Sequence, residues 1–349
     1  MKARILKQIL HFKQPSGTSR GVLYDKPTWF IILENENSIG VGECSMLKGL
    51  SLDDRPDYEQ KLQWVCDNIY FGEQQLYADL VDFPSIQFGV ETAFRSLKNQ
   101  DPFQLFPSPF SKGQSSIPIN GLVWMGSKEF MRQQIVDKIE NGFDCIKLKI
   151  GAIDFETECL LLQSIRKNFS AAEIEIRVDA NGAFAPSEAL EKLKRLSDFN
   201  IHSIEQPIAV NQWDAMARLC EQSPIDIALD EELIGVFSDS KRMKLLKTIR
   251  PHYLILKPSL IGGWQGSESW IDAAEQCKIS WWATSALESN IGLNAIAQWV
   301  FIKQNPLKQG LGTGALYTNN IEAPLEVQKG FLSYNQQSSW DFKLNESCL

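Results

Sequence analysis

Residues 145–151 read CIKLKIG, a short apolar run that carries two lysines separated by one residue. Side chains alternate between the two faces of a β-strand, so Lys147 and Lys149 point to one side and the apolar residues point to the other. Two unit charges about 6.6 Å apart repel each other by roughly 2.5 kcal/mol at an effective dielectric constant of about 20. This repulsion lowers the pKa of one lysine towards the range in which a neutral amine acts as a base. A solvated edge strand also explains the run, so its meaning depends on the rest of the chain.

Strand and helix patterns alternate on both sides of this run, from residue 117 to about residue 314. Pro186 suits the first position of a helix, Asp154 and Asn211 suit the N-cap position, and Gly142 can end a helix. Eight strand patterns within about 200 residues, joined by helical crossovers, predict an α/β fold of the (β/α) barrel type rather than an open sheet. The strands are expected at 117–124, 145–150, 174–180, 202–206, 225–231, 253–258, 279–285 and 310–314, and the helices at 128–141, 154–168, 187–198, 211–222, 238–248, 265–277 and 288–303.

The first hundred residues have a different pattern. We expect strands at 29–33 and 40–43 and helices at 57–69 and 90–97, which is typical of an α+β module. Residues 101–116 then contain three prolines and four serines, which break any regular pattern. This change in composition predicts a domain boundary.

The bulk composition excludes several classes of protein. The chain has 349 residues, 44% of them apolar and 22% charged, as in globular proteins that bury a large core. A net charge of −8 argues against a nucleic-acid partner, and no apolar run approaches the about 18 residues that a membrane span needs. The seven cysteines are scattered without a Cys-x-x-Cys pair, so we expect reduced thiols in a cytoplasmic protein. His11, His202 and His252 do not have the spacing of metal-binding histidines, which disfavours a zinc site. The sequence carries no signal for an oligomeric state.

Acidic residues recur at the ends of three successive predicted strands. Asp179, Glu205 and Asp230 are separated by 26 and 25 residues, about one βα unit each. In a barrel the carboxyl ends of the strands meet at one face, where catalytic groups of this fold lie. Three converging carboxylates need a counter-charge, and oxygen ligands suit a hard cation such as Mg²⁺.

Lys257 ends the next predicted strand and lies four strands after the lysine pair, so it is expected across the mouth of an eight-stranded ring. A single acid at a strand end is usually a helix cap or a surface charge, and we interpret Glu231 and Glu232 as solvated or outer residues. Lysines and acids in register on five consecutive strands are not explained in that way. We therefore treat the set as a candidate active site.

The ordered set of Lys147-x-Lys149, the three acids and Lys257 resembles the enolase superfamily, in its muconate-lactonising-enzyme-like subgroup. The resemblance covers nearly the whole chain, including the GVGE segment at 40–43. It implies a (β/α)7β TIM-like barrel at 116–319, capped by an α+β N-terminal domain at 1–115 together with a C-terminal tail at 320–349. It also implies Mg²⁺ at Asp179, Glu205 and Asp230, with Mn²⁺ as a substitute.

Four further segments resemble the o-succinylbenzoate synthases within that subgroup: GECS at 42–45, FGVETA at 88–93, PINGLVW at 118–124 and SALES at 285–289. This resemblance implies syn-dehydration of 2-succinyl-6-hydroxy-2,4-cyclohexadiene-1-carboxylate to o-succinylbenzoate in menaquinone biosynthesis. It implies three catalytic lysines, namely Lys149 as the base, Lys147 as the group that lowers its pKa, and Lys257 as a cation on the opposite face of the substrate.

The substrate is expected to be a small carboxylate. The polar turn that opens the helix after residue 285 suits a carboxylate at a helix N-terminus, and the polar run at 14–22 is expected to be a mobile loop that closes over the substrate. The residues expected to bind substrate are Asn120, Arg177, Asn181, Ser285, Glu288 and Ser289.

Two alternatives stay open. N-acylamino-acid racemases and other epimerases or cycloisomerases of the superfamily share most of these residues. Dipeptide epimerases are disfavoured, because this chain has Gly312-Thr313-Gly314 where they carry Asp-x-Asp. The non-enzymatic alternative is an inactive barrel that serves as a binding module, and the complete set of lysines and acids argues against it.

Overall fold

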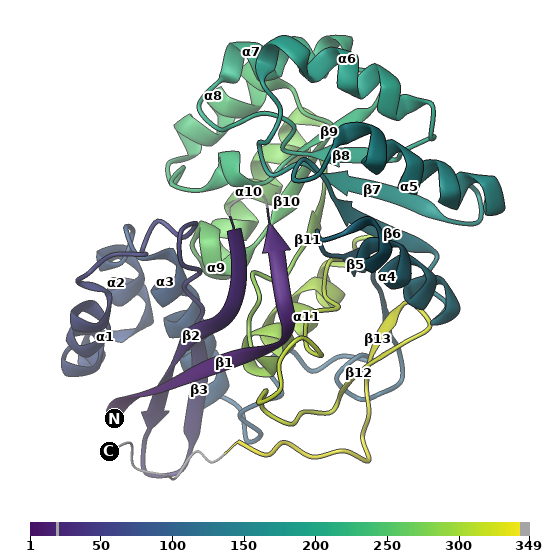
Figure 1. The fold of residues 1–349 in the computed structure, drawn as a ribbon. Coiled ribbons are helices and arrows are strands. Elements are labelled where there is room, and N and C mark those ends of the chain that lie inside the picture. Colours follow the sequence, from purple (N-terminus) through teal and green to yellow (C-terminus); the bar gives the residue numbers. More distant parts are fainter. Residues whose placement is uncertain (19–20, 343–349) are drawn as a thin grey trace.

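The centre of the molecule is a curled parallel sheet, seen in a computed structural model that describes residues 1–18 and 21–342 (Figure 1). Its strand order, β11-β10-β9-β8-β7-β6-β5, follows the chain, as expected when each strand is joined to the next by a helical crossover. The strands are β5 (Gly121–Val123), β6 (Cys145–Lys149), β7 (Glu175–Asp179), β8 (Ser203–Glu205), β9 (Asp226–Leu229), β10 (Tyr253–Leu256) and β11 (Ser280–Ala283).

The two edges of this sheet are joined by residues 309 and 310. Gln309 forms a parallel bridge with Ile119, and Gly310 forms one with Thr284. The eighth strand, predicted at 310–314, is therefore reduced to two bridging residues. The first predicted strand is also interrupted: it splits into β4 (Ile117–Pro118) and β5, because β4 pairs with a C-terminal hairpin instead of the parallel sheet.

Helices cover the outside of the curled sheet (Figure 1). Each predicted helix from residue 128 onward is present within a few residues of its expected bounds, since the 3.6-residue apolar repeat is a local signal. Asp154 caps its helix as predicted, whereas Gln212 rather than Asn211 lies at the N-cap of the helix that begins at Trp213. The helices are α4 (Lys128–Glu140), α5 (Phe155–Asn168), α6 (Pro186–Ser197), α7 (Trp213–Gln222), α8 (Asp239–Ile249), α9 (Pro258–Ile261), α10 (Gly263–Cys277) and α11 (Asn290–Lys303), with a 3₁₀ turn at Glu231–Leu233.

The N-terminal module combines an antiparallel sheet with helices. Its strands are β1 (Lys2–Thr18), β2 (Gly21–Glu34) and β3 (Ile39–Cys44), and its helices are α1 (Tyr58–Asp67), α2 (Gly72–Asp79) and α3 (Pro84–Leu97). Helix α3 lies against β3 so closely that a Cβ atom on Gly42 would come within 1.9 Å of the Gly89 carbonyl oxygen. The loop predicted at 14–22 is instead the far end of the β1–β2 hairpin, and its residues 19–20 lie outside the described residues.

The C-terminal segment contacts both parts of the molecule. Strand β13 (Phe331–Tyr334) pairs with β12 (Leu325–Gln328) and with β4 of the barrel. Beyond this hairpin, Trp340 stacks on Phe103 with ring centroids 4.3 Å apart. In the part of the chain that is described, no helix has the length and apolar character to cross a membrane.

Candidate active site

The three predicted acids lie together at the carboxyl ends of neighbouring strands. Asp179 is the last residue of β7 and pairs in register with Glu205, the last residue of β8. Asp230 follows β9 directly, and Lys149 pairs in register with Asp179 from β6. Parallel strands in register bring these side chains to one face of the sheet, as the spacing along the chain predicts.

The three lysines bind these acids directly. The Lys147 Nζ atom lies 2.9 Å from Asp179 Oδ2 and also donates to Glu205 Oε2. Lys149 Nζ lies 3.0 Å from the same Asp179 oxygen. From the opposite part of the ring, Lys257 donates to Asp230 Oδ2. The two lysines of β6 therefore share one carboxylate oxygen, which holds their ammonium groups close to each other.

Burial and charge act in opposite directions on the cluster. Burial lowers the pKa of Lys147, but Asp179 and Glu205 outweigh burial and hold that pKa well above its ordinary value. Burial also lowers the pKa of Lys257, and Asp230 reverses the effect, so the net shift is upward. Burial would raise the pKa of Asp179, yet the lysines hold it far below its usual range. Only Glu205 among these acids has a raised pKa, because burial and the charge of Asp179 outweigh its lysine partners.

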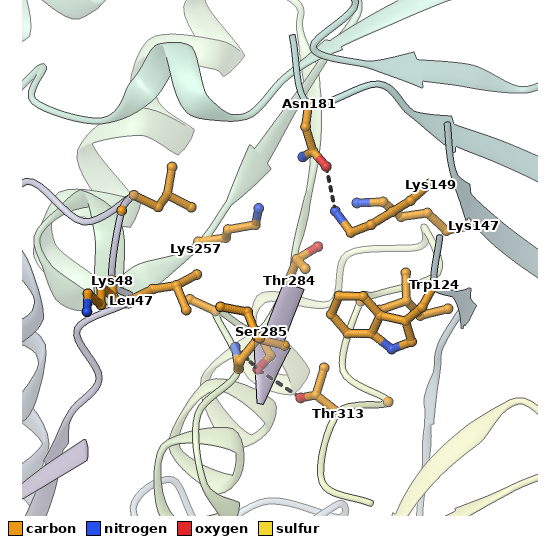
Figure 2. Close-up of a pocket in the computed structure, with 18 of the residues that line it drawn as sticks. Leu47, Lys48, Trp124, Lys147, Lys149, Asn181, Lys257, Thr284, Ser285 and Thr313 are labelled. Carbon is orange, nitrogen blue, oxygen red and sulfur yellow. Dashed lines mark hydrogen bonds between the residues drawn. The ribbon is translucent and has the colours of Figure 1, made fainter. Parts of the chain in front are cut away.

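A cavity of about 430 Å³ opens next to this cluster (Figure 2). Lys147, Lys149 and Lys257 line one part of it, and Trp124 lies beside the lysine pair. The remaining described lining residues come from the β1–β2 hairpin, the loop after β3, and the strands and connections of the barrel: Gly21, Val22, Leu23, Leu47, Lys48, Gly49, Leu50, Asn120, Leu122, Asn181, Thr284, Ser285, Ala286, Leu287, Gly310, Gly312 and Thr313.

Three of the six predicted substrate-binding residues line the cavity, namely Asn120, Asn181 and Ser285. Asn181 accepts a hydrogen bond from Lys149 Nζ at 2.8 Å, so it helps to orient this amine. The Asn120 Oδ1 atom is buried and has no hydrogen-bond partner among the described residues, which leaves it able to accept from a ligand.

The placement of Arg177 argues against substrate contact. Its side chain is 1% exposed, donates to Glu175 and to the Lys308 carbonyl, and stacks over Trp282 at 4.1 Å. Arg177 shares a strand face with Asp179, as expected, but it lies two residues nearer the amino end of β7. It therefore lies deeper in the barrel and not beside the cavity.

The helix N-terminus expected to receive a substrate carboxylate already has a carboxylate partner. Glu43 of β3 accepts hydrogen bonds from the Ser289 amide at 2.9 Å and the Gly292 amide at 2.8 Å, at the start of α11. Glu288 is fully buried and accepts from the hydroxyl groups of Ser259 and Ser285. Glu288 and Ser289 consequently support the turn that lines the cavity and do not line it themselves.

Several lining residues were not identified from the sequence. Lys48, Leu47 and Leu50 belong to a loop of the N-terminal module, and loops carry no periodic signal. Trp124 and Thr313 lie in the strands predicted at 117–124 and 310–314, but the strand pattern alone does not indicate a binding role. Leu47, Lys48 and Leu50 line the cavity because the N-terminal module lies against the mouth of the barrel.

The chemistry of the carboxylate cluster fits a hard divalent cation. Glu205 Oε1 is buried without a hydrogen-bond partner among the described residues, which leaves this oxygen able to bind a cation. As the described side chains lie, no three of His, Cys, Asp or Glu form an open metal cage, and Lys147 and Lys257 contact the acids instead. The donor set is made of oxygen atoms, which Mg²⁺ prefers.

Comparison with known proteins supports a family. The sequence profile of the enolase C-terminal domain-like family matches residues 131–338. An o-succinylbenzoate synthase of Desulfotalea psychrophila is 46% identical over 93% of this chain and 96% of its own length. The crystal structure of MenC from the same organism matches with a TM-score of 0.85 and 42% identity, covering 95% of this chain and 99% of that one.

The crystal structure of a muconate lactonizing enzyme of Pseudomonas fluorescens, complexed with muconolactone, matches this chain with a TM-score of 0.80 and 19% identity. The match covers 97% of this chain and 96% of that chain, so the two proteins share the fold. The profile match over more than half of the chain agrees with the near-complete match to the Desulfotalea protein. This chain therefore belongs to the enolase superfamily.

Proposed function

We propose that this chain is a magnesium-dependent lyase that dehydrates 2-succinyl-6-hydroxy-2,4-cyclohexadiene-1-carboxylate to o-succinylbenzoate, a step of menaquinone biosynthesis. The observation that carries the proposal is the placement of Lys149 and Lys257, which line one cavity from strands on opposite parts of the ring (Figure 2). The near-full-length relationship to an o-succinylbenzoate synthase supports the choice of reaction.

Asp179, Glu205 and Asp230 would hold Mg²⁺, with Mn²⁺ as a substitute, and the bound ion would supply positive charge beside a substrate carboxylate. Lys149 removes the proton next to that carboxylate and returns it to the departing hydroxide. Lys147 stays protonated, because its carboxylate neighbours raise its pKa, and it provides a fixed positive charge next to Lys149.

Lys257 contributes from the other face of the substrate. Its ammonium group is held protonated by Asp230, so it can stabilise negative charge that develops on the substrate during proton removal. Asn181 orients Lys149, and Asn120 offers a free acceptor in the same cavity. Dehydration forms an aromatic ring, so it demands little of the group that protonates the leaving hydroxide.

The division of the chain is also part of the proposal. We assign residues 1–115 and the tail 320–349 to an α+β capping domain and residues 116–319 to a (β/α)7β barrel. Two observations support this assignment. The tail contacts Phe103 of the N-terminal part, and the cavity at the barrel is lined in part by residues 21–23 and 47–50. The hairpin tip would close over a bound carboxylate in a cytoplasmic enzyme.

The main test follows the loss of diene absorbance when purified protein and Mg²⁺ are mixed with the cyclohexadiene substrate. Lys149→Ala should reduce turnover by about two to four orders of magnitude, because it removes the base and leaves the fold intact. Circular dichroism of the variant controls for folding. Turnover close to that of the wild type in a folded Lys149→Ala protein would contradict the mechanism.

A second candidate function is racemisation of N-acylamino acids. It is favoured by the same two lysines on opposite faces of the cavity, since racemisation requires one group to remove a proton and another to deliver one from the other side. Polarimetry can follow the racemisation of N-succinylamino acids by the purified protein. This measurement, made beside the dehydration assay, distinguishes the two activities.

A further inference from the structure

The cavity is lined at one end by a loop of the N-terminal module that carries Lys48, a lysine with no part in the proposed proton transfers. We propose that Lys48 binds the second carboxylate of a dicarboxylate substrate, while the first carboxylate lies beside Lys149 and Lys257. The inference rests on the proposed function and makes it more specific. It identifies the accepted acids as those with two carboxylates joined by an apolar spacer.

The charges that line the cavity are the first support. Four lysines line it, and the described lining residues include no Asp or Glu. Lys147, Lys149 and Lys257 are matched by the three carboxylates that they contact. The Lys48 ammonium group has no hydrogen bond or ion pair with another described residue. Lys48 therefore adds a positive charge that no side chain of the cluster balances.

Position is the second support. Figure 2 shows Lys48 and Leu47 on one side of the cavity and the pair Lys147 and Lys149 on the other side, with Lys257 between them. The two groups of lysines come from different parts of the chain, the loop after β3 and the strands of the barrel. A ligand that contacts both groups must extend across the cavity.

The rest of the lining combines apolar side chains with the hydroxyl groups of Thr284, Ser285 and Thr313, and it carries no charge. Leu47, Trp124 and Leu287 belong to one hydrophobic cluster, and the partly buried Leu23 and Leu50 pack against it. A carboxylate placed against these apolar side chains would lose its hydration without a cationic partner, which is costly. The cavity thus suits a ligand with an apolar centre and a charged group at each end, as in a ring acid that carries a succinyl chain.

The loop around Lys48 is ordered by its own hydrogen bonds. The Leu47 amide donates to Ser51 Oγ at 2.8 Å, the Ser51 amide donates to the Leu47 carbonyl at 2.9 Å, and the Gly49 amide donates to Asp54 Oδ2 at 2.7 Å. These bonds fix the backbone on both sides of Lys48. A lysine on a fixed backbone loses less conformational freedom on binding than one on a mobile loop.

The protein side of the test is a change of charge at position 48. In the full-length protein with Mg²⁺, Lys48→Met should raise the KM for the cyclohexadiene dicarboxylate about three- to tenfold, because Lys48 is solvent-exposed and its ion pair is partly screened. The kcat should change less than about twofold, since no group at the reacting atoms is altered. Lys48→Arg keeps the charge and should restore most of the affinity.

The ligand side removes the second carboxylate. Calorimetry compares o-succinylbenzoate with 2-butyrylbenzoate, which has a methyl group in place of the distal carboxylate. The wild type should prefer the succinyl compound about three- to tenfold, and Lys48→Met should bind the two within about twofold of each other. Lys112→Met is the matched control, because it removes the same charge from an exposed lysine outside the cavity.

An unchanged preference in Lys48→Met, or the same loss of preference in Lys112→Met, would overturn the assignment of Lys48. Calorimetry needs no turnover, so the two proposals can fail separately. A wild type that binds both acids without dehydrating the diene contradicts the proposed function alone.

Discussion

At the scale of single residues, Lys149 and Lys257 differ in what the chemistry requires of them. In the proposed mechanism, dehydration needs Lys149 to exchange a proton but needs only positive charge from Lys257. Arginine keeps the charge and does not exchange its proton at neutral pH. Lys257→Arg should therefore lower dehydration by about ten- to a hundredfold through altered geometry, while Lys149→Arg lowers it by about a thousandfold or more. Steady-state rates of the two folded variants give the comparison.

Equal losses in the two variants would mean that both lysines transfer protons, which is the requirement of a racemase. The cavity allows this comparison because both lysines line it and each is paired with a single nearest acid, Asp179 or Asp230. Each arginine thus meets a carboxylate of similar burial. The difference between the two variants then reports proton transfer more than packing.

The cluster of lysines and acids could be predicted from the sequence, whereas several residues that line the cavity could not, for a physical reason. One charged residue recurs per βα unit in the series Asp179, Glu205, Asp230 and Lys257, and strand register converts that spacing into spatial proximity. Arg177 follows the same register but lies two residues nearer the amino end of its strand, so it does not line the cavity where the sequence predicts a substrate contact. Lys48 has no such repeat, and its position depends on how the N-terminal module docks.

At the scale of elements, the start of α11 is held by a carboxylate from the other part of the molecule. Glu43 accepts from the Ser289 amide and hydroxyl, the Gly292 amide and the Thr28 hydroxyl. Lys26 is 2% exposed, and its charge interacts with that of Glu43. Helix periodicity correctly predicted α11 but gave no sign of this partner, because residues 43 and 289 are distant in sequence.

Glu43→Ala should lower the free energy of unfolding by about 3–5 kcal/mol, since it leaves buried donors without their acceptor and removes a negative charge that stabilises the buried ammonium group of Lys26. Glu43→Gln keeps one acceptor oxygen and should cost about 1–3 kcal/mol. Urea titration followed by circular dichroism measures both. Glu36→Ala, which removes an exposed carboxylate from the β2–β3 turn, should change stability by less than about 0.5 kcal/mol. A loss of the same size in the Glu36 and Glu43 variants would show that Glu43 has no special role in docking.

At the scale of the whole molecule, Glu91 connects the N-terminal module to the barrel. It lies on α3, and its carboxylate accepts hydrogen bonds from the amides of Trp264 at 2.7 Å and Gln265 at 3.1 Å at the start of α10. Gly263 allows this approach, because a Cβ atom at that position would lie 2.0 Å from Glu91 Oε2. Burial raises the pKa of Glu91 from 4.5 to about 8, although the two backbone hydrogen bonds act in the opposite direction.

The sign of the pH effect follows from this raised pKa. Between about pH 4.5 and pH 8 the folded protein keeps the Glu91 proton and the unfolded chain releases it, so the free energy of unfolding falls as the pH rises through this range. The total change from this one group is on the order of a few kcal/mol.

The Glu91→Gln side chain cannot titrate, so the stability of the wild type relative to this variant should decline steadily from pH 5 to pH 8. Urea titrations of the two proteins at each pH give that difference in stability. The contributions of titrating groups common to both proteins cancel in it, including that of Asp53, whose pKa is raised by burial to about 6. A difference that stays constant over this range would mean that Glu91 is ionised in the folded protein, and that the module docks on the barrel through a charged carboxylate at the α10 N-terminus.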